Sequence, residues 1–570
     1  MIEKMTRYDF ILLSGNRDSF LESLGKLGVM DVTRSSRPVD ERSAAMLSEI
    51  ESVSGEISRI EKGKDAHLSE LEADLSSLHK EADSCAGWGE YDRGKLDSLG
   101  IPVRFYCVPE KKYDDSWADA FAIQEVERDK GKVWFVAFGE ADIPAEPLPA
   151  PARSIGEVQE SIASKEAEIE AYKNELEGLK DTLPELQDRL TGLRREMGLY
   201  LASVGGESAA DGGLTVFEGF APSGEDERLA KAFDELDCVW FSSKASIEDN
   251  PPIKLKNNKF VKQFEVLTDM YGRPDYNEFD PTPYISIFFL LFFAMCMGDA
   301  GYGILLIILG MLLRKVQNFK SLAPLVTILG VGTFIIGIVM HTFFGYDIST
   351  LTWLPSPIKA VMITGTIAGF EAQMVLSIII GIVHLCLAMI VKTVYATRNK
   401  GFLGSLGVWG WTVLIVGGVV LGVLALFSLV PGPILKWIVI GLGVLSALGI
   451  FLFNDIHRSP LKNVGSGLWE TYNTVTGLLG DVLSYLRLYA LGLAGGMLGK
   501  AFNDIAAMTL GDGSIGPGWL AFVVILVIGH ALNFAMCCLG AFVHPLRLNF
   551  LEFFKNSGYD GKGRKYDPLV

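Results

Sequence analysis

The sequence lacks several patterns that mark soluble enzymes, secreted domains and nucleic-acid-binding proteins. Its seven cysteines are scattered without paired spacing, so neither a zinc site nor a disulfide framework is predicted. Residues 1–9 contain no apolar core of the kind that a signal peptide needs, so the front half is expected to stay in the cytoplasm. Residues 1–280 also lack a basic surface, because they carry 57 acidic against 34 basic residues, and this argues against nucleic-acid binding.

Charge is distributed very unevenly along the 570 residues. The whole chain has a net charge of −17, yet residues 1–280 hold −23 and residues 281–570 hold +6, from 11 acidic and 17 basic residues. Hydrophobic residues make up 49% of the chain, and they are concentrated in the second part. The sequence therefore predicts a charged domain over 1–280 joined to a membrane domain over 281–570.

Heptad spacing fills two long stretches of the charged domain. Apolar residues recur every three or four positions over about 153–200, interrupted at Lys165, and again over about 44–82, with one slip near Lys64. Two such arms predict an antiparallel coiled-coil hairpin, and Pro184 predicts a bend in the second arm. Two ordinary amphipathic helices on a compact domain are the alternative.

A small α+β lobe is expected at each end of this hairpin. The base lobe, 1–40 plus 205–250, shows strand, helix and strand at 7–14, 17–28 and 29–33, and the same order at 214–220, 225–236 and 238–242. The tip lobe, 86–150, has strand-like runs at 103–108 and 133–138. We expect both lobes to be ferredoxin-like and the whole to be a rod that holds two things apart. No catalytic constellation is recognised in 1–280.

The second part is predicted to be mainly α-helical and to cross the membrane eight times. Twelve basic residues fall on the predicted inner connections and tail and two fall outside, which places both termini in the cytoplasm. The seventh span, about 46 residues or roughly 69 Å, exceeds a bilayer core of about 30 Å, as does the eighth, so these helices must tilt, bend or project into water. The spans run over about 284–297, 301–314, 322–344, 371–391, 403–429, 437–454, 465–510 and 518–553.

The seventh span carries a fixed cation about midway along its length. Arg487 shares a helical face with Asp481 and Ser484, and its guanidinium cannot discard its proton when it is buried. An arginine at membrane depth is a candidate functional residue. The alternative is a static ion pair with Asp481 or Glu470 on the same helix.

The eighth span carries a longer polar stripe, which predicts a face toward an aqueous cleft or a partner, not toward lipid. Two other histidines in the apolar runs, His341 and His384, are expected to be hydrogen-bonded packing residues. The stripe consists of His530, Asn533, Cys537, Gly540, His544, Arg547 and Leu551.

One motif resembles a phosphate-binding loop but fails its requirements. Residues 494–501 read Ala-Gly-Gly-Met-Leu-Gly-Lys-Ala, which lacks the first glycine and the final hydroxyl residue, and no strand precedes it. We therefore expect no nucleotide site, no catalytic residues, no metal site and no cofactor, and the chain is not expected to be an enzyme on its own.

Six segments together resemble the membrane stator subunit of rotary V-type and archaeal-type ATPases, called subunit a or subunit I, in its prokaryotic form. The resemblance covers nearly the whole chain, weakly over 1–245 and strongly after that. It rests on Asn250-Pro-Pro-Ile-Lys-Leu-Lys-Asn, Phe264-Glu265, Met270-Tyr-Gly-Arg-Pro-Asp-Tyr-Asn-Glu-Phe-Asp-Pro-Thr-Pro283, Met297-Gly-Asp-Ala-Gly-Tyr-Gly303, Ser484-Tyr-Leu-Arg-Leu-Tyr-Ala-Leu and His544-Pro-Leu-Arg-Leu-Asn-Phe-Leu-Glu552.

The resemblance implies roles for individual residues. Arg487 would be the arginine that faces the ring of proteolipid c subunits during translocation of H⁺ or Na⁺, and Arg547 would be the second arginine. Where many relatives have a glutamate this chain has Cys537, and where some have a histidine it has Gly495, which puts the lining of the ion path in doubt. Further candidates for half-channels or the ring-facing surface are Asp481, Ser484, Glu470, His530, Asn533, His544 and Glu552.

The same resemblance implies partners and a location. The rod would be held by peripheral stalks of E and G subunits, close to the subunit that attaches the central stalk, and the membrane domain would lie in the lipid of the cell membrane. Two other readings of the sequence stay open. A membrane-anchored coiled-coil receptor or scaffold would explain the rod and the spans, and a secondary transporter would explain the spans alone.

Overall fold

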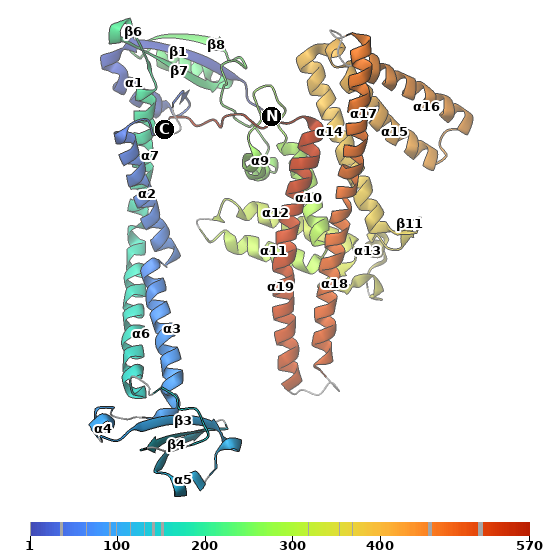
Figure 1. Cartoon of the computed structure of the whole chain (residues 1–570). Helices are drawn as coiled ribbons and strands as arrows, with labels where there is room; N and C mark the ends of the chain where they lie inside the picture. The colour runs from blue at the N-terminus through green and yellow to red at the C-terminus, as the bar shows by residue number, and fades with distance from the viewer. Residues whose placement is uncertain are drawn as a thin grey trace. The chain divides into compact units, whose positions relative to one another are not determined.

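The computed structural model describes residues 2–569 except 35–37, 64, 90–92, 99, 115, 130, 140–142, 150–152, 317–318, 353, 368, 454–458 and 511–516. Lys64, where a slip of the heptad is predicted, thus lies outside the described residues. The chain is mostly helical with small sheets, as the sequence predicts (Figure 1). It divides into two compact units: one holds Met1–Ser14, Leu27–Val32 and Ser208–Pro568, and the other holds Gly15–Lys26, Thr33–Glu207 and Leu569–Val570.

An antiparallel sheet opens the first unit. Its strands are β1 (Met5–Leu13), β2 (Asp31–Val32), β7 (Leu214–Pro222) and β8 (Val239–Lys244), in the order β2-β7-β1-β8. Alternate residues of β1 are buried, among them Tyr8 and Phe10, and both rings contact Phe233 of α8 (Asp226–Phe233) at 5.3 and 5.0 Å. This is the strand order of the ferredoxin-like arrangement predicted for the base lobe.

The second unit contains paired helices. α2 (Glu41–Lys62) packs against α7 (Leu183–Val204), and α3 (Ala66–Cys85) packs against α6 (Ile155–Gly178) (Figure 1). Two contacts in each pair show that the partners run antiparallel. Tyr200 bonds to Asp40 while Gln187 bonds to Glu61, and Arg153 meets Glu81 at 2.6 Å while Lys173 meets Glu72 at 3.4 Å. The unit also contains α1 (Arg17–Leu27). The short strand β6 (Glu207–Ala209) pairs with β7 of the sheet in the first unit.

Each predicted arm is interrupted at the same level, so neither is one continuous helix. α2 ends at Gly63, whose φ of 57° is left-handed, and Asp65 then caps α3. Opposite this break, α6 and α7 are separated by a 3₁₀ turn at Leu179–Thr182. Pro184 lies in the first turn of α7, where a proline costs no hydrogen bond, so the bend precedes it.

The tip lobe contains a small sheet with short helices. Its described strands β3 (Val103–Pro109), β4 (Ile123–Asp129) and β5 (Lys132–Phe138) form an antiparallel sheet in the order β3-β5-β4. This order corresponds to the first three strands of a ferredoxin-like arrangement, in which the second and third strands form a hairpin, and the prediction of a complete ferredoxin-like lobe stays a prediction. The strand β4 was not predicted, because its sequence is polar and its side chains are mostly exposed. Two short helices accompany the sheet, α4 (Arg93–Ser98) and α5 (Ser116–Ala120).

Among the described residues of the first unit, five helical segments are long and apolar enough to cross a membrane: Ala372–Gly404, Leu406–Leu426, Gly432–Leu452, Leu461–Met508 and Gly518–Ser557. Three apolar helices are shorter, α10 (Thr282–Met297), α11 (Ala300–Leu313) and α12 (Ala323–Val339), so the predicted count of eight crossings stays a prediction. The other elements are α9 (Glu265–Tyr271), α13 (Ser356–Val361), and two hairpins, β9 (Thr342–Phe343) with β10 (Tyr346–Asp347) and β11 (Thr366–Ile367) with β12 (Phe370–Glu371).

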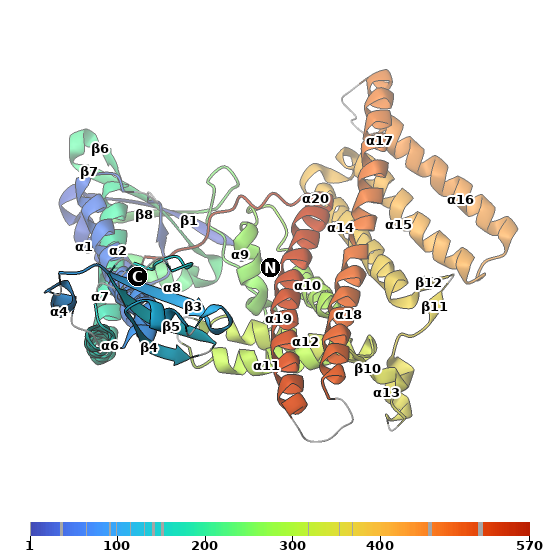
Figure 2. The same cartoon turned by 60° about the horizontal axis from the view of Figure 1, so that its bottom comes forward.

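The two overlong segments are both irregular. The first consists of α17 (Pro460–Ser484) and α18 (Leu486–Met508), separated at Tyr485. The second consists of α19 (Pro517–Arg547), a π-helical turn at Leu548–Phe553 and α20 (Phe554–Ser557). α18 and α19 lie side by side in both views (Figures 1 and 2). The remaining long helices are α14 (Ala372–Gly404), α15 (Leu406–Leu426) and α16 (Gly432–Ala447), which a π-helical turn extends to Leu452.

The segment after α20 returns to the sheet of the same unit. The backbone N–H of Ile253 donates to the carbonyl of Arg564 at 2.7 Å, and Gly563 forms a bridge with Arg273. The backbone N–H of Asp567 then donates to the carboxylate of Asp31, in β2, at 2.9 Å. Residues 563–567 therefore tie the end of the last apolar segment to the base lobe.

Candidate functional site

Arg487 is the second residue of α18 and lies directly after the break between α17 and α18. The side chain is partly buried, and its Nη1 is buried without a hydrogen-bond partner among the described residues. The alternative reading was an ion pair with Asp481 or Glu470. The carboxylate of Asp481 instead contacts Asn556 at 2.8 Å and Lys555 at 3.4 Å. The contacts of the Asp481 carboxylate are thus with α20, and not with the guanidinium group of Arg487.

One polar cluster lies beyond Arg487, where α18 meets α11 and α19; we call it the neutral cluster. His530 is 2.9 Å from the hydroxyl of Tyr302 through Nδ1 and 2.9 Å from Asn503 through Nε2. The amide of Asn533 donates to the Tyr302 hydroxyl at 2.8 Å and to the carbonyl of Gly495 at 2.9 Å. The thiol of Cys537 donates to Asn533 at 3.4 Å, so five side chains without a formal charge form one hydrogen-bonded chain.

Sequence reasoning missed Tyr302 and Asn503 as members of this cluster. Asn503 follows Gly495 and Gly499 at spacings of four on a buried face of α18, and this periodicity could have indicated it. Tyr302 lies in the segment Met297–Gly303, which contributed to the resemblance, yet nothing in the sequence shows what its hydroxyl contacts. The polar stripe of α19 faces α11 and α18 at this level instead of an open cleft.

Asp299 explains how Tyr302 comes to lie there. Its carboxylate is 1% exposed and accepts the backbone N–H groups of Gly301, Tyr302, Phe344 and Gly345 at 2.8 to 3.2 Å. Two of these donors open α11 and two belong to the turn between β9 and β10. The carboxylate therefore caps α11 and fixes this turn against it.

A second polar region lies before Arg487, along α17; we call it the charged cavity. It has a volume of about 230 Å³. Two predicted candidates, Glu470 and Asp481, line it together with Asn473, Lys555 and Asn556, so residues from α17 and α20 meet in one place. Lys555 and Asn556 were not predicted, because no sequence pattern reports that α20 packs beside α17.

The remaining candidates lie on α19 and its π-helical continuation. Glu552 is buried, its Oε2 has no hydrogen-bond partner among the described residues, and its carboxyl group is a hydrogen-bond neighbour of Ser484. Arg547 is exposed. His544 lies near enough to both Arg487 and Arg547 for their charges to act on it.

Gly495 and Cys537, the two positions at which the resemblance implies a departure from relatives, lie opposite each other. A Cβ built on Gly495 would stand 2.8 Å from the Sγ of Cys537. Both residues also line a small cavity of about 140 Å³ between α18 and α19. The two positions therefore belong to one place, at the edge of the neutral cluster.

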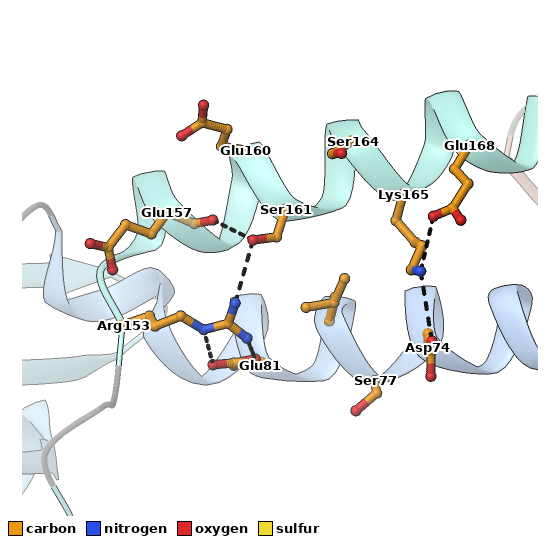
Figure 3. A pocket seen from close by; sticks show the side chains of 11 residues that line it. Asp74, Ser77, Glu81, Arg153, Glu157, Glu160, Ser161, Ser164, Lys165 and Glu168 are labelled. Carbon is orange, nitrogen blue, oxygen red and sulfur yellow. Dashed lines mark hydrogen bonds and ion pairs between the residues drawn. The ribbon is translucent and has the colours of Figure 1, made fainter.

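A cavity of about 800 Å³ in the second unit has a different character (Figure 3). It lies between α3 and α6, and five of the charged groups that line it pair with one another: Glu81 with Arg153, and Lys165 with Asp74 at 3.8 Å and with Glu168 at 3.0 Å. It brings together no nucleophile with an adjacent base, so it is a solvated seam between two helices. In the described part of the chain, no group of side chains could hold a metal ion.

Comparisons with known proteins point in one direction. Residues 153–339 match the family described as the V-type ATPase 116 kDa subunit family. The chain is 33% identical over 394 residues to "A-type ATP synthase subunit I" of Methanocaldococcus jannaschii, which covers 62% of this chain and 54% of that protein. It is 28% identical over 340 residues to "V-type ATP synthase subunit I 1" of Treponema pallidum, covering 56% and 52%.

A third relative is matched over more of its length. "V-type ATP synthase subunit I" of Chlamydia pneumoniae is 26% identical over 569 residues, covering 87% of this chain and 82% of that protein. For the archaeal relatives, by contrast, the chain spans about half of their length. Each alignment covers only part of this chain. The relatives are therefore similar at Arg487, the neutral cluster and the charged cavity only where an alignment includes those residues.

Proposed function

We propose that the chain belongs to the family of subunit I of V-type and A-type ATP synthases, to which it is similar, and that it is the membrane stator subunit of a rotary ATPase. In this proposal it provides the path along which H⁺ or Na⁺ reaches and leaves a rotating ring of c subunits. It binds no nucleotide, and the chemistry on ATP belongs to other subunits.

The observation that carries the proposal is the position of Arg487 between two separate polar regions. Asp481 of the charged cavity lies six residues before Arg487 and Gly495 of the neutral cluster lies eight after it, which corresponds to about 9 and 12 Å of helix. Two polar regions that end at different heights, with a cation between them, suit two half-channels. An ion could then enter from one side of the membrane and leave toward the other.

The cation supplies the chemistry of unloading. A carboxylate of a c subunit would arrive from lipid in its neutral, ion-loaded form. Close to the guanidinium of Arg487 the ionised form is favoured, so the carboxylate releases its ion into the adjacent half-channel. The same positive charge repels cations that would otherwise pass directly between the half-channels. A potential of 100 mV supplies roughly 2.3 kcal/mol per elementary charge, so several ions must be combined for one ATP.

The paired helices of the second unit suit the stator role. We propose that α2, α3, α6 and α7 form a coiled-coil hairpin that peripheral stalks of E and G subunits hold in the cytoplasm, near the central-stalk attachment subunit. The membrane domain would cross the cell membrane eight times, with both termini in the cytoplasm. Acidic residues exceed basic ones by 23 over 1–280, which suits a solvated strut.

Removing the chain tests the proposed function at the level of the complex. Membrane vesicles from cells that lack it should lose ATP-driven ion uptake, and the restored wild-type chain should recover it. After mild detergent extraction the chain should migrate with nucleotide-binding subunits and a small hydrophobic c subunit. A chain that migrates without them, from vesicles that still pump, would indicate a receptor or a secondary transporter instead.

A further inference from the structure

Tyr485 stands where α17 and α18 separate, two residues before Arg487. Its side chain is fully buried. The bonds at the break are of the 3₁₀ type, from the N–H of Tyr485 to the carbonyl of Val482 at 3.2 Å and from the N–H of Leu488 to the carbonyl of Tyr485 at 3.1 Å. The orientation of Tyr485 therefore sets the direction in which α18, and with it Arg487, leaves the break.

Helix α14 holds Tyr485 at both ends of its ring. The hydroxyl shares a hydrogen bond of 2.9 Å with Nδ1 of His384, which is itself fully buried. One turn earlier on α14, a Cβ at Gly381 would overlap the ring of Tyr485, so only glycine admits the ring at this distance. α14 thus presents a gap for the ring and a polar partner for its hydroxyl.

His384 also contacts the other long segment of the proposed ion path. Its ring stacks on Phe553 of the π-helical turn with a centroid distance of 4.7 Å and an interplanar angle of 7°. On its other side lies Phe288 of α10 at 4.2 Å. Phe553 directly follows Glu552, and Tyr485 lies two residues before Arg487. The imidazole of His384 therefore contacts a neighbour of each of these two charged residues.

We propose that Tyr485, held by His384 and Gly381, is a positioning residue for Arg487. This inference rests on the proposed function, because it concerns the placement of the cation that function needs. The hydrogen bond fixes the start of α18 relative to α14, and the stack on Phe553 fixes the same imidazole relative to the end of the second long segment. Loss of the hydrogen bond lets Arg487 shift from the position at which it meets the c-subunit carboxylate.

The test compares ions taken up per ATP hydrolysed by the intact ATPase complex in vesicles. Tyr485→Phe removes only the hydroxyl, and we expect the ratio to fall by about fivefold while the amount of complex in the membrane stays constant. Thr412→Val is the matched control, because it removes a buried hydroxyl that bonds to Thr393 of the same helix α14, away from α18. It should leave the ratio unchanged.

Two substitutions of His384 separate hydrogen bonding from packing. His384→Asn retains a polar atom near the place of Nδ1 and loses the stack, whereas His384→Phe retains the stack and loses the polar atom. We expect the asparagine variant to retain the higher ratio. A higher ratio for the phenylalanine variant, an unchanged ratio in Tyr485→Phe, or an equal loss in Thr412→Val would overturn the inference.

Arg487→Ala distinguishes the failure of this inference from the failure of the proposed function. If Arg487→Ala abolishes uptake and Tyr485→Phe does not lower it, the positioning role is wrong and the proposed function stands. If Arg487→Ala itself pumps normally, the proposed function fails. Should Tyr485→Phe be missing from the membrane, the two His384 variants decide.

Discussion

The charged cavity and the neutral cluster lie on either side of Arg487, and they differ in chemistry. The charged cavity has two carboxylates, two lysines and a volume of about 230 Å³. The neutral cluster joins a phenol, an imidazole, two amides and a thiol by hydrogen bonds, and Asn533 at its centre is 1% exposed. One region can admit water and stabilise ions, while the other must pass protons or move apart before an ion can enter.

The largest expected effect concerns the support of the neutral cluster. Asp299→Ala would leave four buried backbone N–H groups without their acceptor, which costs at least about 3 kcal/mol. We expect the purified variant to melt several degrees below the wild type in a thermal unfolding measurement. Asp347→Ala is the control, because its carboxylate accepts from Ser349 at an exposed turn. Equal melting temperatures for both variants would show that Asp299 does not support the cluster.

A smaller effect tests whether water reaches the two regions differently. A cysteine at Asn473, in the charged cavity, should react with a membrane-impermeant thiol reagent at least about ten times faster than a cysteine at Asn533. The unsubstituted chain gives the background from its seven cysteines. Labelling of both positions after denaturation shows that both thiols are intact. Equal rates in the native complex would remove the distinction between an open and a closed region.

The smallest effect extends the comparison to a carboxylate in the second unit. The hydroxyl of Tyr172 donates to Asp65 at 2.5 Å, and this bond, with the N–H of Leu68, lowers the pKa of Asp65 below its ordinary value. A carboxyl group with a lowered pKa in the folded state stabilises that state above the pKa of the unfolded chain, about 3.9, and the stabilisation is lost as the pH falls through the lowered value.

Tyr172→Phe should therefore lower the melting temperature of the helix pairs slightly at pH 7. The difference from the wild type should shrink as the pH falls below about 3.9, because Asp65 is then protonated in the unfolded chain and increasingly in the folded one. Circular dichroism of the full chain, recorded against temperature at several pH values, measures this. A difference that grows toward low pH would contradict the assigned role of Asp65.

Local periodicity predicted the helices and strands better than it predicted the contacts between them. Repeats of three and four located the paired helices, and alternating apolar residues located β1 and β7, because both patterns are written in neighbouring residues. The same reasoning placed Arg487, His530 and Asn533 inside apolar helices.

What could not be predicted depends on residues that are distant in the chain. The bond between Tyr302 and His530 spans 228 residues, and the one between His384 and Tyr485 spans 101. The break at Tyr485 was also missed, since neither proline nor glycine marks it and α14 supplies its cause. The hairpin of β4 and β5 was overlooked because β4 is too polar to give a strand signal.

The most direct measurement of the central role of Arg487 is ATP-driven ion uptake by vesicles that contain the complex with Arg487→Ala. Lys500→Ala is the matched control, since it removes a positive charge from the exposed surface of the same helix, α18. We predict that Arg487→Ala abolishes uptake while the complex stays assembled in the membrane, and that Lys500→Ala pumps as the wild type does. Normal uptake in Arg487→Ala would contradict the proposed ion path.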